Sequence, residues 1–349
     1  MYISPSNEGF AYMGRIDFTN PDAPVLFYAG SQVRFRFYGS SFKVCVRSTI
    51  YWGELSLGII LDGKMISLQL FPENNGKSVA IMVADDLPYA IHEVIVFKKH
   101  AANQLLTFEG IDIEGELCSK PILPPLKMEV YGDSVCAGEV IEAEDFVGKS
   151  DPDSHNSRYD NVWHSFVMQT ARRLNAQINN ICQGGIALFD GTGYFHYPDY
   201  IGLESVYDKL CYFPEGGISM WDFSLYTPDI VIIAIGQNDK HNGKTDADDI
   251  DIYDPVYRKM WKTGYIKLVN DLNNKYNSPQ FVLITTILMH DKEWDKAIDE
   301  VAYELSSEGV RAFHYVFERN GKATPGHPRI SEHNEMADEL TNFIKSNLL

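Results

Sequence analysis

The sequence predicts an α/β protein with two domains: an N-terminal β-sandwich of the jelly-roll type and a three-layer α/β/α domain with a mainly parallel sheet. The chain has 349 residues, enough for two domains of about 100–200 residues each. Short alternating segments fill residues 1–118, whereas strand-like and helix-like segments alternate over residues 127–349. Residues 119–126 hold three prolines, which predicts a stiff, extended linker at the domain boundary.

The N-terminal strands are predicted from a two-residue period. Val33, Phe35 and Phe37 alternate with two arginines, as in a strand with one buried face. Asp62 and Gly63 separate two apolar runs, which is a strong hairpin signal. Many short strands with little helical periodicity favour a β-sandwich. The expected strands cover residues 32–38, 42–47, 55–61, 65–70, 78–84, 91–98 and 105–113.

The C-terminal domain is predicted from alternating strands and helices. Residues 229–235 form a continuous apolar run, typical of a parallel strand buried on both faces. Further strands are expected at residues 175–181, 280–289 and 310–317, and helices at residues 162–174, 257–276, 294–306 and 331–348. Ser331 is the expected N-cap of the last helix, with Asn334 where a capping box would carry Glu or Gln.

Two segments do not follow this alternation. Residues 139–159 are polar, and residues 189–226 are long and rich in aromatic side chains, Tyr194 and Trp221 among them. Loops of this length in a compact domain are usually functional or disordered, and the aromatic content of the second argues against disorder. Both follow expected strand ends, where α/β sheets bind ligands.

The composition excludes several classes of partner. With 48 acidic and 30 basic residues the net charge is −18, which disfavours nucleic acid and anionic membranes and suits a neutral or cationic substrate. No apolar run is long enough to span a membrane, and the N-terminus lacks the features of a signal peptide. We therefore expect a cytoplasmic protein, or a secreted one if a leader has been removed. The five cysteines show no paired spacing, which favours reduced, packed thiols and disfavours a metal site.

The first candidate site is the stretch from Met128 to Gly138. A short apolar strand ends at Gly132, and Asp133 and Ser134 follow at the turn. A serine presented where a strand breaks sharply is how α/β folds offer a nucleophile above the sheet. Gly-Asp-Ser is a weak motif by itself, so its weight depends on the rest of the chain.

Three further candidates follow other expected strands. Gly184 and Gly185 end one strand, and glycine lets a backbone N–H approach a ligand oxygen closely; an ordinary turn is an equal alternative. Asn238 follows the most buried strand and can aim its amide into a cleft, although a solvated turn fits as well. His327 lies in a stiff Gly/Pro-rich loop before the last helix and is the candidate base; a lone histidine is more often structural.

These four elements, in this order, resemble the four blocks of the SGNH (GDSL-type) hydrolases, and with the preceding β-domain and linker the chain resembles carbohydrate esterase family 2. The resemblance implies removal of acetyl groups from xylan, mannan and related saccharides through an acetyl-enzyme. It implies Ser134 as nucleophile, His327 as general base, and the Ser134 N–H, the Gly184 or Gly185 N–H and the Asn238 amide as oxyanion donors. No cofactor and no metal is implied, and a homo-oligomer stays compatible with the sequence.

One position departs from the family pattern. SGNH enzymes usually carry Asp three residues before the histidine, where this chain has Thr324. The resemblance to family 2 implies a Ser–His dyad with a backbone carbonyl behind His327. A carbonyl that accepts the Nδ1 proton would fix the tautomer with Nε2 facing Ser134. A distant Asp or Glu folding in behind His327 is the alternative.

The aromatic segment suggests where the saccharide stacks. Trp221 and Tyr194 are the first candidates, although each ring can equally well pack the loop itself. The acidic run at residues 246–254 lacks the spacing of a calcium loop, so a solvated loop is the better interpretation. Two other functions stay open: an SGNH esterase for lipid or simple aryl esters, and a carbohydrate-binding protein without catalysis.

Overall fold

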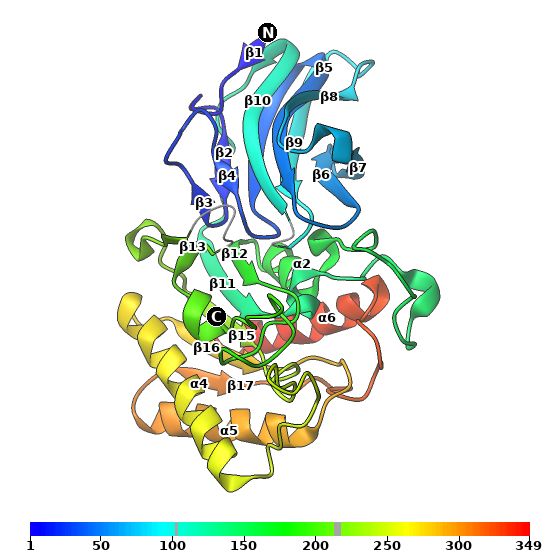
Figure 1. The fold of residues 1–349 in the computed structure, drawn as a ribbon. Helices are drawn as coiled ribbons and strands as arrows, with labels where there is room; N and C mark the ends of the chain where they lie inside the picture. The colour runs from blue at the N-terminus through cyan, green and yellow to red at the C-terminus, as the bar shows by residue number, and fades with distance from the viewer. Residues whose placement is uncertain (102–103, 213–217) are drawn as a thin grey trace.

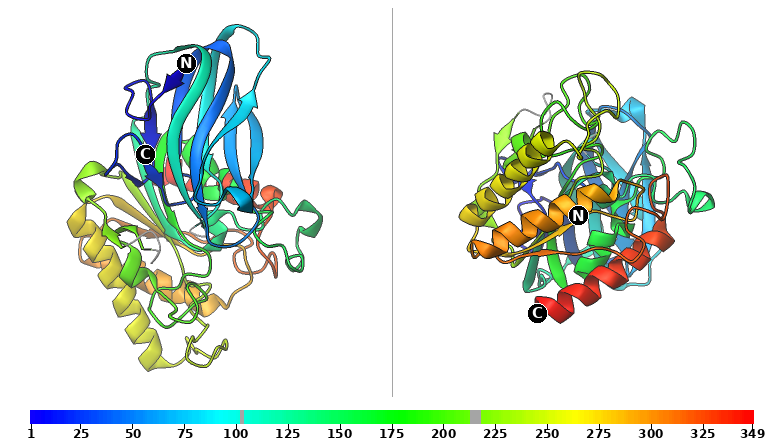
Figure 2. Two further views of the ribbon diagram at one scale, coloured as in Figure 1. Left: turned by 45° about the horizontal axis from the view of Figure 1, so that its top comes forward. Right: turned by 90° about the horizontal axis from the view of Figure 1, so that it is seen from below.

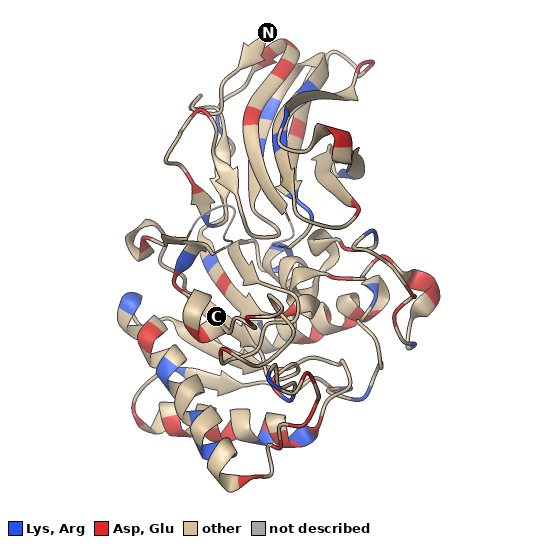
Figure 3. Cartoon of the chain, in the orientation of Figure 1, with Lys and Arg blue, Asp and Glu red and all other residues tan. Residues whose placement is uncertain are grey.

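The computed structural model describes residues 1–101, 104–212 and 218–349. An antiparallel sheet of ten strands occupies the N-terminal part, and a parallel sheet of five strands lies in the C-terminal part (Figure 1). The last strand of the first sheet ends at Leu117 and the first strand of the second begins at Leu126, so the proline-rich residues join the two. Acidic residues are spread along both parts of the chain (Figure 3).

The antiparallel sheet curls around one long strand, β5 (Gln32–Ile50). β5 pairs with β10 (Gln104–Leu117), β9 (Ala90–Lys98) and β8 (Ser78–Ala84), so it contributes to both sides of the curled sheet (Figure 2). Its Phe35 and Phe37 are buried in a core of their own, as the alternation predicts. The mixed fold with an antiparallel and a parallel sheet is confirmed, and the jelly-roll topology stays a prediction.

The structure corrects the predicted break within β5. We expected separate strands at residues 32–38 and 42–47, but the strand continues through Gly39. The register with β10 shifts between Glu114 and Gly115, and a Cβ at Gly39 would lie 1.9 Å from the Glu114 carbonyl oxygen. The chain therefore forms a β-bulge with close backbone contact near Gly39, and the strand does not end there.

The remaining strands of this sheet are short. β6 (Leu55–Leu61) and β7 (Lys64–Leu70) form the predicted hairpin, in which Asp62 and Gly63 have φ values of 48° and 79°. Positive φ at both central residues is what the tight turn of a two-residue hairpin requires, and Asp-Gly supplies it. The sequence did not predict the first strands, which are β1 (Tyr2–Ile3), β2 (Ala11–Met13), β3 (Ile16–Asp17) and β4 (Val25–Leu26).

The parallel sheet has the order β12-β11-β15-β16-β17. Its strands are β11 (Leu126–Gly132), β12 (Ala176–Cys182), β15 (Ile230–Ala234), β16 (Gln280–Ile284) and β17 (Ala312–His314). Every residue of β15 is buried, which explains its continuous apolar sequence. In chain order the five strands read 2-1-3-4-5, so the connections change direction between β11 and β15. Ligand sites of open α/β sheets lie at the carboxyl ends of the strands at such a switch point.

Helices cover both faces of the parallel sheet (Figure 2). α2 (Phe166–Arg173) and α6 (Ile330–Asn347) pack on one face, and α4 (Pro255–Lys275) and α5 (Lys292–Ser307) pack on the other. Each face has its own hydrophobic core. Two one-turn helices, α1 (Ser134–Ala137) and α3 (Leu203–Val206), and the two-stranded pair β13 (Lys209–Cys211) and β14 (Ser219–Met220) lie in the connections. This is the three-layer arrangement that the sequence predicts.

Several predicted boundaries differ from the structure. The strands expected at residues 280–289 and 310–317 end earlier, at Ile284 and His314. After the first of them, Thr285 and Thr286 join the polar network described below. The helix expected at residues 162–174 is divided by Ser165, whose side chain caps α2. Arg329, and not Ser331, is the N-cap of α6, and Glu332 accepts the Arg329 N–H at 3.0 Å.

Two features of the structure concern membrane-spanning helices and the state of the cysteines. In the part of the chain that the structure describes, no helix combines the length and apolar character needed to cross a membrane. All five cysteines are free thiols, and three of them are buried.

A buried ion pair joins the two sheets. Arg15, which follows β2, is fully buried against Glu129 of β11, with its Nη2 2.9 Å from Glu129 Oε1. The remaining Arg15 donors reach the carbonyls of Tyr207 and Lys209 and the hydroxyl of Tyr131. A buried charge without its partner is strongly destabilising, so this pair ties the N-terminal domain to the parallel sheet.

We predict that Arg15→Met lowers the free energy of unfolding by about 3–5 kcal/mol, because Glu129 would stay buried without a counter-charge. Arg47→Met is the matched control: its Arg47–Glu109 pair, at 3.1 Å, is partly exposed, with side chains 44% and 20% exposed, whereas both side chains of the Arg15 pair are fully buried. The control should change the free energy of unfolding by only about 0–1 kcal/mol. Chemical denaturation followed by fluorescence measures both, and equal effects of the two variants would contradict the assignment.

Candidate active site

Ser134 is the first residue of α1, directly after β11. The Asp133 side chain caps this helix by accepting the Val135 N–H at 3.0 Å. Gly132 lets the chain turn closely, since a Cβ there would lie 2.6 Å from the Cys136 sulfur. Ser134 thus stands at the switch point of the sheet, with its backbone N–H at a helix N-terminus, where N–H groups lack intrahelical partners.

His327 lies beside Ser134, as the sequence led us to expect. Its Nε2 is 2.8 Å from the Ser134 Oγ, although the two residues are 193 positions apart. On the other side, its Nδ1 is 2.6 Å from the Asp151 Oδ2. An ionised carboxylate only accepts hydrogen bonds, so Nδ1 carries the proton and Nε2 is left to accept from the serine hydroxyl. The three side chains form a hydrogen-bonded chain of serine, histidine and aspartate.

Asp151 is held by more than the imidazole. Its Oδ1 accepts the His327 backbone N–H at 2.9 Å and the Arg329 Nη2 at 2.8 Å. Burial alone would raise the pKa of the Asp151 carboxyl, but the hydrogen bonds from His327 and Arg329 outweigh burial and hold the pKa well below its usual value. The carboxylate is therefore charged over the whole neutral range.

The Asp151 carboxylate in turn raises the pKa of His327. Burial lowers the pKa of His327, but the hydrogen bond and the charge of Asp151 outweigh it and leave the pKa above its ordinary value. The imidazolium form is thus stabilised in place, as a base that must accept a proton from serine requires.

The expected backbone carbonyl behind His327 is wrong. A carboxylate from the polar segment at residues 139–159 takes that place, which is the alternative that the sequence left open. Thr324 does not contact the imidazole and instead donates to the Lys149 carbonyl at 3.4 Å. The only sequence signal for Asp151 was its location in a long polar loop after a strand, and that signal does not single it out from the neighbouring acidic residues.

The oxyanion candidates follow the carboxyl ends of the two strands that flank β11. Gly184 and Gly185 follow β12, Asn238 follows β15, and all three line one cavity with Ser134 and His327. Gly185 has a φ of 73° and makes the turn, while its carbonyl accepts the Tyr194 N–H at 2.7 Å. The Asn238 Nδ2 donates to the Ile186 carbonyl at 3.1 Å and, more weakly, to Asp133 at 3.4 Å. A ligand oxygen would replace the longer of these two contacts.

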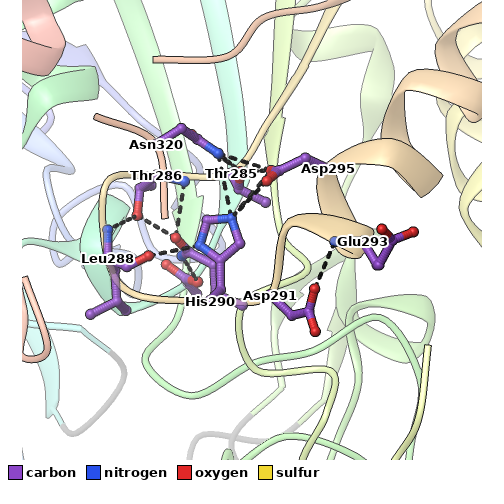
Figure 4. A network of polar contacts seen from close by, with 10 residues as sticks. Thr285, Thr286, Leu288, His290, Asp291, Glu293, Asp295 and Asn320 are labelled. Atoms are coloured by element: carbon purple, nitrogen blue, oxygen red, sulfur yellow. Dashed lines mark hydrogen bonds and ion pairs between the residues drawn. The ribbon is translucent and has the colours of Figure 1, made fainter. Parts of the chain in front are cut away.

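A polar network under the cavity holds these loops together. Gln237 donates to Asp133 Oδ2 at 2.6 Å and accepts the Thr286 N–H at 2.9 Å, which links the loop after β16 to the capping residue of α1. Leu288 of the same loop lines the cavity, and its carbonyl accepts from His290 Nδ1 at 2.7 Å (Figure 4).

The far end of this network reaches the segment that carries His327. Asp295 accepts from Asn320 at 2.9 Å and lies 3.2 Å from His290 Nε2 (Figure 4). The Met289 N–H donates to the Thr324 carbonyl at 2.9 Å. The loop after β16 therefore supports the loop of the histidine along its length.

The cavity has a volume of about 580 Å³ and an aromatic rim. Tyr194 and Tyr197, from the long aromatic segment, are 47% and 74% exposed at this rim. Trp52, which is 55% exposed, reaches the rim from the N-terminal domain, and sequence reasoning missed it because a domain contact carries no local signal.

The structure contradicts the predicted role of Trp221. We expected it to stack on a ligand, but it is buried, and the Arg15 guanidinium lies 5.3 Å from its ring centroid. Trp221 does not line the cavity and instead covers the ion pair between the two sheets. Part of its segment, residues 213–217, lies outside the described residues, and the aromatic Phe213 that the sequence offered there lies outside them too.

Tyr194 is held in place by the acidic run. Its ring stacks on His241 with centroids 4.0 Å apart, and its hydroxyl donates to Asp248 at 2.6 Å. Asp248 also pairs with Lys240 at 2.9 Å and with His241 at 3.1 Å. Asp248 therefore has protein partners. Among the described residues no group of three or more His, Cys, Asp or Glu side chains is arranged to hold a metal ion.

Comparison with known proteins follows the same division of the chain. Residues 12–121 match the family model described as carbohydrate esterase 2 N-terminal. The chain is 28% identical over 356 residues to the cellulase/esterase CelE of Acetivibrio thermocellus, covering 98% of this chain and 40% of CelE. It is 27% identical over 320 residues to the acetylxylan esterase/glucomannan deacetylase of Cellvibrio japonicus, covering 84% of this chain and 83% of that protein. The chain thus spans about two fifths of the length of CelE.

A solved structure extends the similarity over the whole chain. The family two carbohydrate esterase of Clostridium thermocellum in complex with cellohexaose superposes with a TM-score of 0.80 at 25% identity. The superposition covers 97% of this chain and 99% of that one, so both sheets and their arrangement are shared.

We predict that Asp151→Asn lowers the pKa of His327, because the charge and the hydrogen bond that raise it are lost or weakened. At a pH near the pKa of His327 in the wild-type protein, the imidazole of the variant would be mostly neutral. Histidine NMR titration measures this shift directly. Asp145→Asn, which alters an exposed residue of the same segment, should leave the His327 titration unchanged. An unchanged His327 pKa in Asp151→Asn would contradict the geometry.

Proposed function

We propose that the chain is a serine esterase of carbohydrate esterase family 2 that removes O-acetyl groups from xylan or related plant saccharides; its match to the N-terminal model of that family and its similarity to two carbohydrate esterases support this proposal. The observation that carries the proposal is the contact of the Ser134 hydroxyl with His327, whose other nitrogen meets the Asp151 carboxylate. The names of the relatives support a carbohydrate ester as substrate, and the neighbour with bound cellohexaose supports a saccharide as ligand.

In the proposed first half-reaction, His327 Nε2 takes the proton of the Ser134 hydroxyl as Oγ attacks the acetyl carbonyl carbon. Asp151 holds the ring in the tautomer that makes this transfer effective and stabilises the imidazolium that results. The N–H groups of Ser134 and Gly184 and the Asn238 amide would bind the negative oxygen. We assign Gly184 because Gly185 makes the turn toward Tyr194.

The imidazolium then returns its proton to the departing sugar oxygen, which leaves the acetyl group on Ser134 and completes the first half-reaction. In the second half-reaction, His327 deprotonates a water molecule, whose oxygen attacks the carbonyl carbon of the acetyl-enzyme. The bond from this carbon to Ser134 Oγ then breaks, Oγ takes the proton back from His327, and acetate leaves. Neither half-reaction requires a cofactor or a metal. We thus replace the dyad expected from the sequence with a triad in which Asp151 supplies the carboxylate.

The cavity favours a neutral saccharide over a lipid. Its lining includes the carboxyl side chains of Glu139 and Asp160 and contains no lysine or arginine among the described residues. Aromatic rings at the rim, Trp52 and Tyr197, offer flat apolar faces to the C–H side of a sugar ring. An extended apolar channel for an acyl chain is not among the features of this lining.

We predict that the protein releases acetate from acetylated xylan and from p-nitrophenyl acetate but hydrolyses a long-chain p-nitrophenyl ester at least ~10²-fold more slowly, because the carboxyl groups of Glu139 and Asp160 in the lining disfavour burial of a long acyl chain. Ser134→Ala should abolish acetate release with an unchanged circular dichroism spectrum. Faster turnover of the long-chain ester would favour the lipid esterase instead. Saccharide binding without hydrolysis of any acetyl ester would favour the non-catalytic binding protein.

We also predict that Asn238→Ala lowers kcat by about 10²–10³-fold, the usual effect of losing one oxyanion donor. KM should change little, because the donor acts mainly on the charge that develops in the transition state. Asn334→Ala, at an exposed position of α6, is the matched control and should keep the wild-type kcat. A wild-type kcat in Asn238→Ala would remove this residue from the proposed role.

A further inference from the structure

Glu139 is a carboxyl group in the catalytic cavity to which the mechanism above gives no role. It follows Gly138, the left-handed C-cap of α1, and its backbone N–H donates to the Ser134 carbonyl at 3.0 Å. The residue is therefore fixed to the same turn that presents the serine. Its side chain lines the cavity together with Ser134, Gly184 and His327.

The Glu139 carboxyl packs directly on Gly184. A Cβ added at position 184 would lie 1.8 Å from the Glu139 Oε1, closer than any real contact. Gly184 has no positive φ, so the backbone itself does not require glycine at this position. The carboxyl thus occupies the wall beside a proposed oxyanion donor, and the close packing accounts for the glycine.

The protein leaves this carboxyl without a hydrogen-bond donor. Two other acidic side chains of the same segment each have a hydrogen-bond donor. Glu142 accepts from Lys99 at 3.0 Å, and Glu144 accepts the Ile330 N–H at 2.7 Å. Over residues 1–101, 104–212 and 218–349, no donor hydrogen-bonds the Glu139 carboxyl. A carboxyl in a cavity wall normally has a partner, and the open side here is the side where substrate binds.

Burial, aided by nearby negative charges, raises the pKa of Glu139 and keeps its carboxyl protonated at neutral pH. The pKa of Glu139 is raised to about 8, mainly by burial and next by the negative charge of Asp160. His327 opposes this rise, and the charges of Asp133 and Asp151 add smaller contributions to it. Behind Asp160, His100 Nδ1 lies 3.9 Å from the Asp160 Oδ2. A neutral acid is both a donor and an acceptor, and it does not oppose negative charge developing beside Gly184.

We propose that the Glu139 carboxyl recognises the saccharide by hydrogen-bonding a free hydroxyl group adjacent to the acetylated one. This inference rests on the proposed function and names the feature that the substrate must carry. A sugar hydroxyl supplies both the donor and the acceptor that a protonated carboxyl needs. The preferred substrates are then partly acetylated neutral saccharides, and fully acetylated sugars lack the group that Glu139 recognises.

The test compares Glu139→Leu and Glu139→Gln on two substrates. One is a partly acetylated xylo-oligosaccharide, which has free neighbouring hydroxyls, and the other is p-nitrophenyl acetate, which has none. Glu139→Leu should lower kcat/KM on the oligosaccharide, chiefly through KM, by a factor about 10-fold or more larger than any loss on p-nitrophenyl acetate. Glu139→Gln keeps a donor and an acceptor, so it should restore most of the oligosaccharide activity at pH 7.

The pH profile separates recognition from a merely structural role. Above pH 8 the wild-type carboxyl loses its proton, hence its donor, and places a negative charge beside the oxyanion site. Activity on the oligosaccharide should therefore fall above pH 8 in the wild type and stay level in Glu139→Gln. Glu144→Gln, the same change in the same segment outside the cavity, should retain the wild-type fall.

Equal losses on both substrates in Glu139→Leu, or an unchanged oligosaccharide KM, would overturn the proposal. Binding measured by calorimetry in a Ser134→Ala background keeps the test independent of the esterase assignment. There the added Glu139→Leu change should weaken oligosaccharide binding about 10-fold. If the wild type hydrolyses no acetyl ester, the proposed function fails. If Ser134→Ala and the double variant Ser134→Ala/Glu139→Leu bind the oligosaccharide equally, the proposed role of Glu139 fails as well.

Discussion

The hydrogen-bonded chain from Asp151 through His327 to Ser134 is the interaction on which the rest of the site depends. Its three members come from three separate loops, and each distance in it is 2.8 Å or less. A serine hydroxyl is a poor nucleophile unless a correctly oriented base removes its proton. The carboxylate supplies that orientation, and Arg329 holds the carboxylate by a second hydrogen bond at 2.8 Å. Loss of any one of these contacts would leave the imidazole free to rotate or to take the wrong tautomer.

The fold explains how such remote residues meet. In a parallel sheet all strands end at the same edge, and the order of these strands changes direction between β11 and β15. Ser134 and Asn238 follow these two strands, and Gly184 follows the neighbouring strand. The N-terminal domain also takes part, because Trp52 and Ala101 complete the cavity wall. The Arg15–Glu129 ion pair holds that domain against the sheet, so the shape of the cavity depends on a contact outside it.

Much of this could be predicted from the sequence, for identifiable reasons. Strand ends are marked by apolar runs followed by glycine and polar residues, and these marks led to Ser134, Gly184 and Asn238. His327 was proposed from its Gly/Pro-rich loop before the last helix. Asp151 was not, because it belongs to an irregular loop in which neither periodicity nor spacing distinguishes one acid from another. Trp221 was misplaced because an aromatic side chain in a loop can cover a domain contact as readily as it can line a cavity. Similarly, the alternation of β5 is interrupted near Gly39, where the strand has a bulge, and the sequence therefore predicted two strands there. The roles of the site residues and the domain limits stay predictions.

The most direct test of the central claim is to map where a fluorophosphonate, which reacts with activated serine hydroxyls, attaches to the protein. Mass spectrometry of the digested adduct identifies the modified residue, and the rate of labelling measures its activation. The account predicts a single adduct on Ser134 in the wild-type protein and labelling at least ~10²-fold slower in His327→Ala. An adduct on another serine, or equal labelling of Ser134 with and without the imidazole, would contradict it.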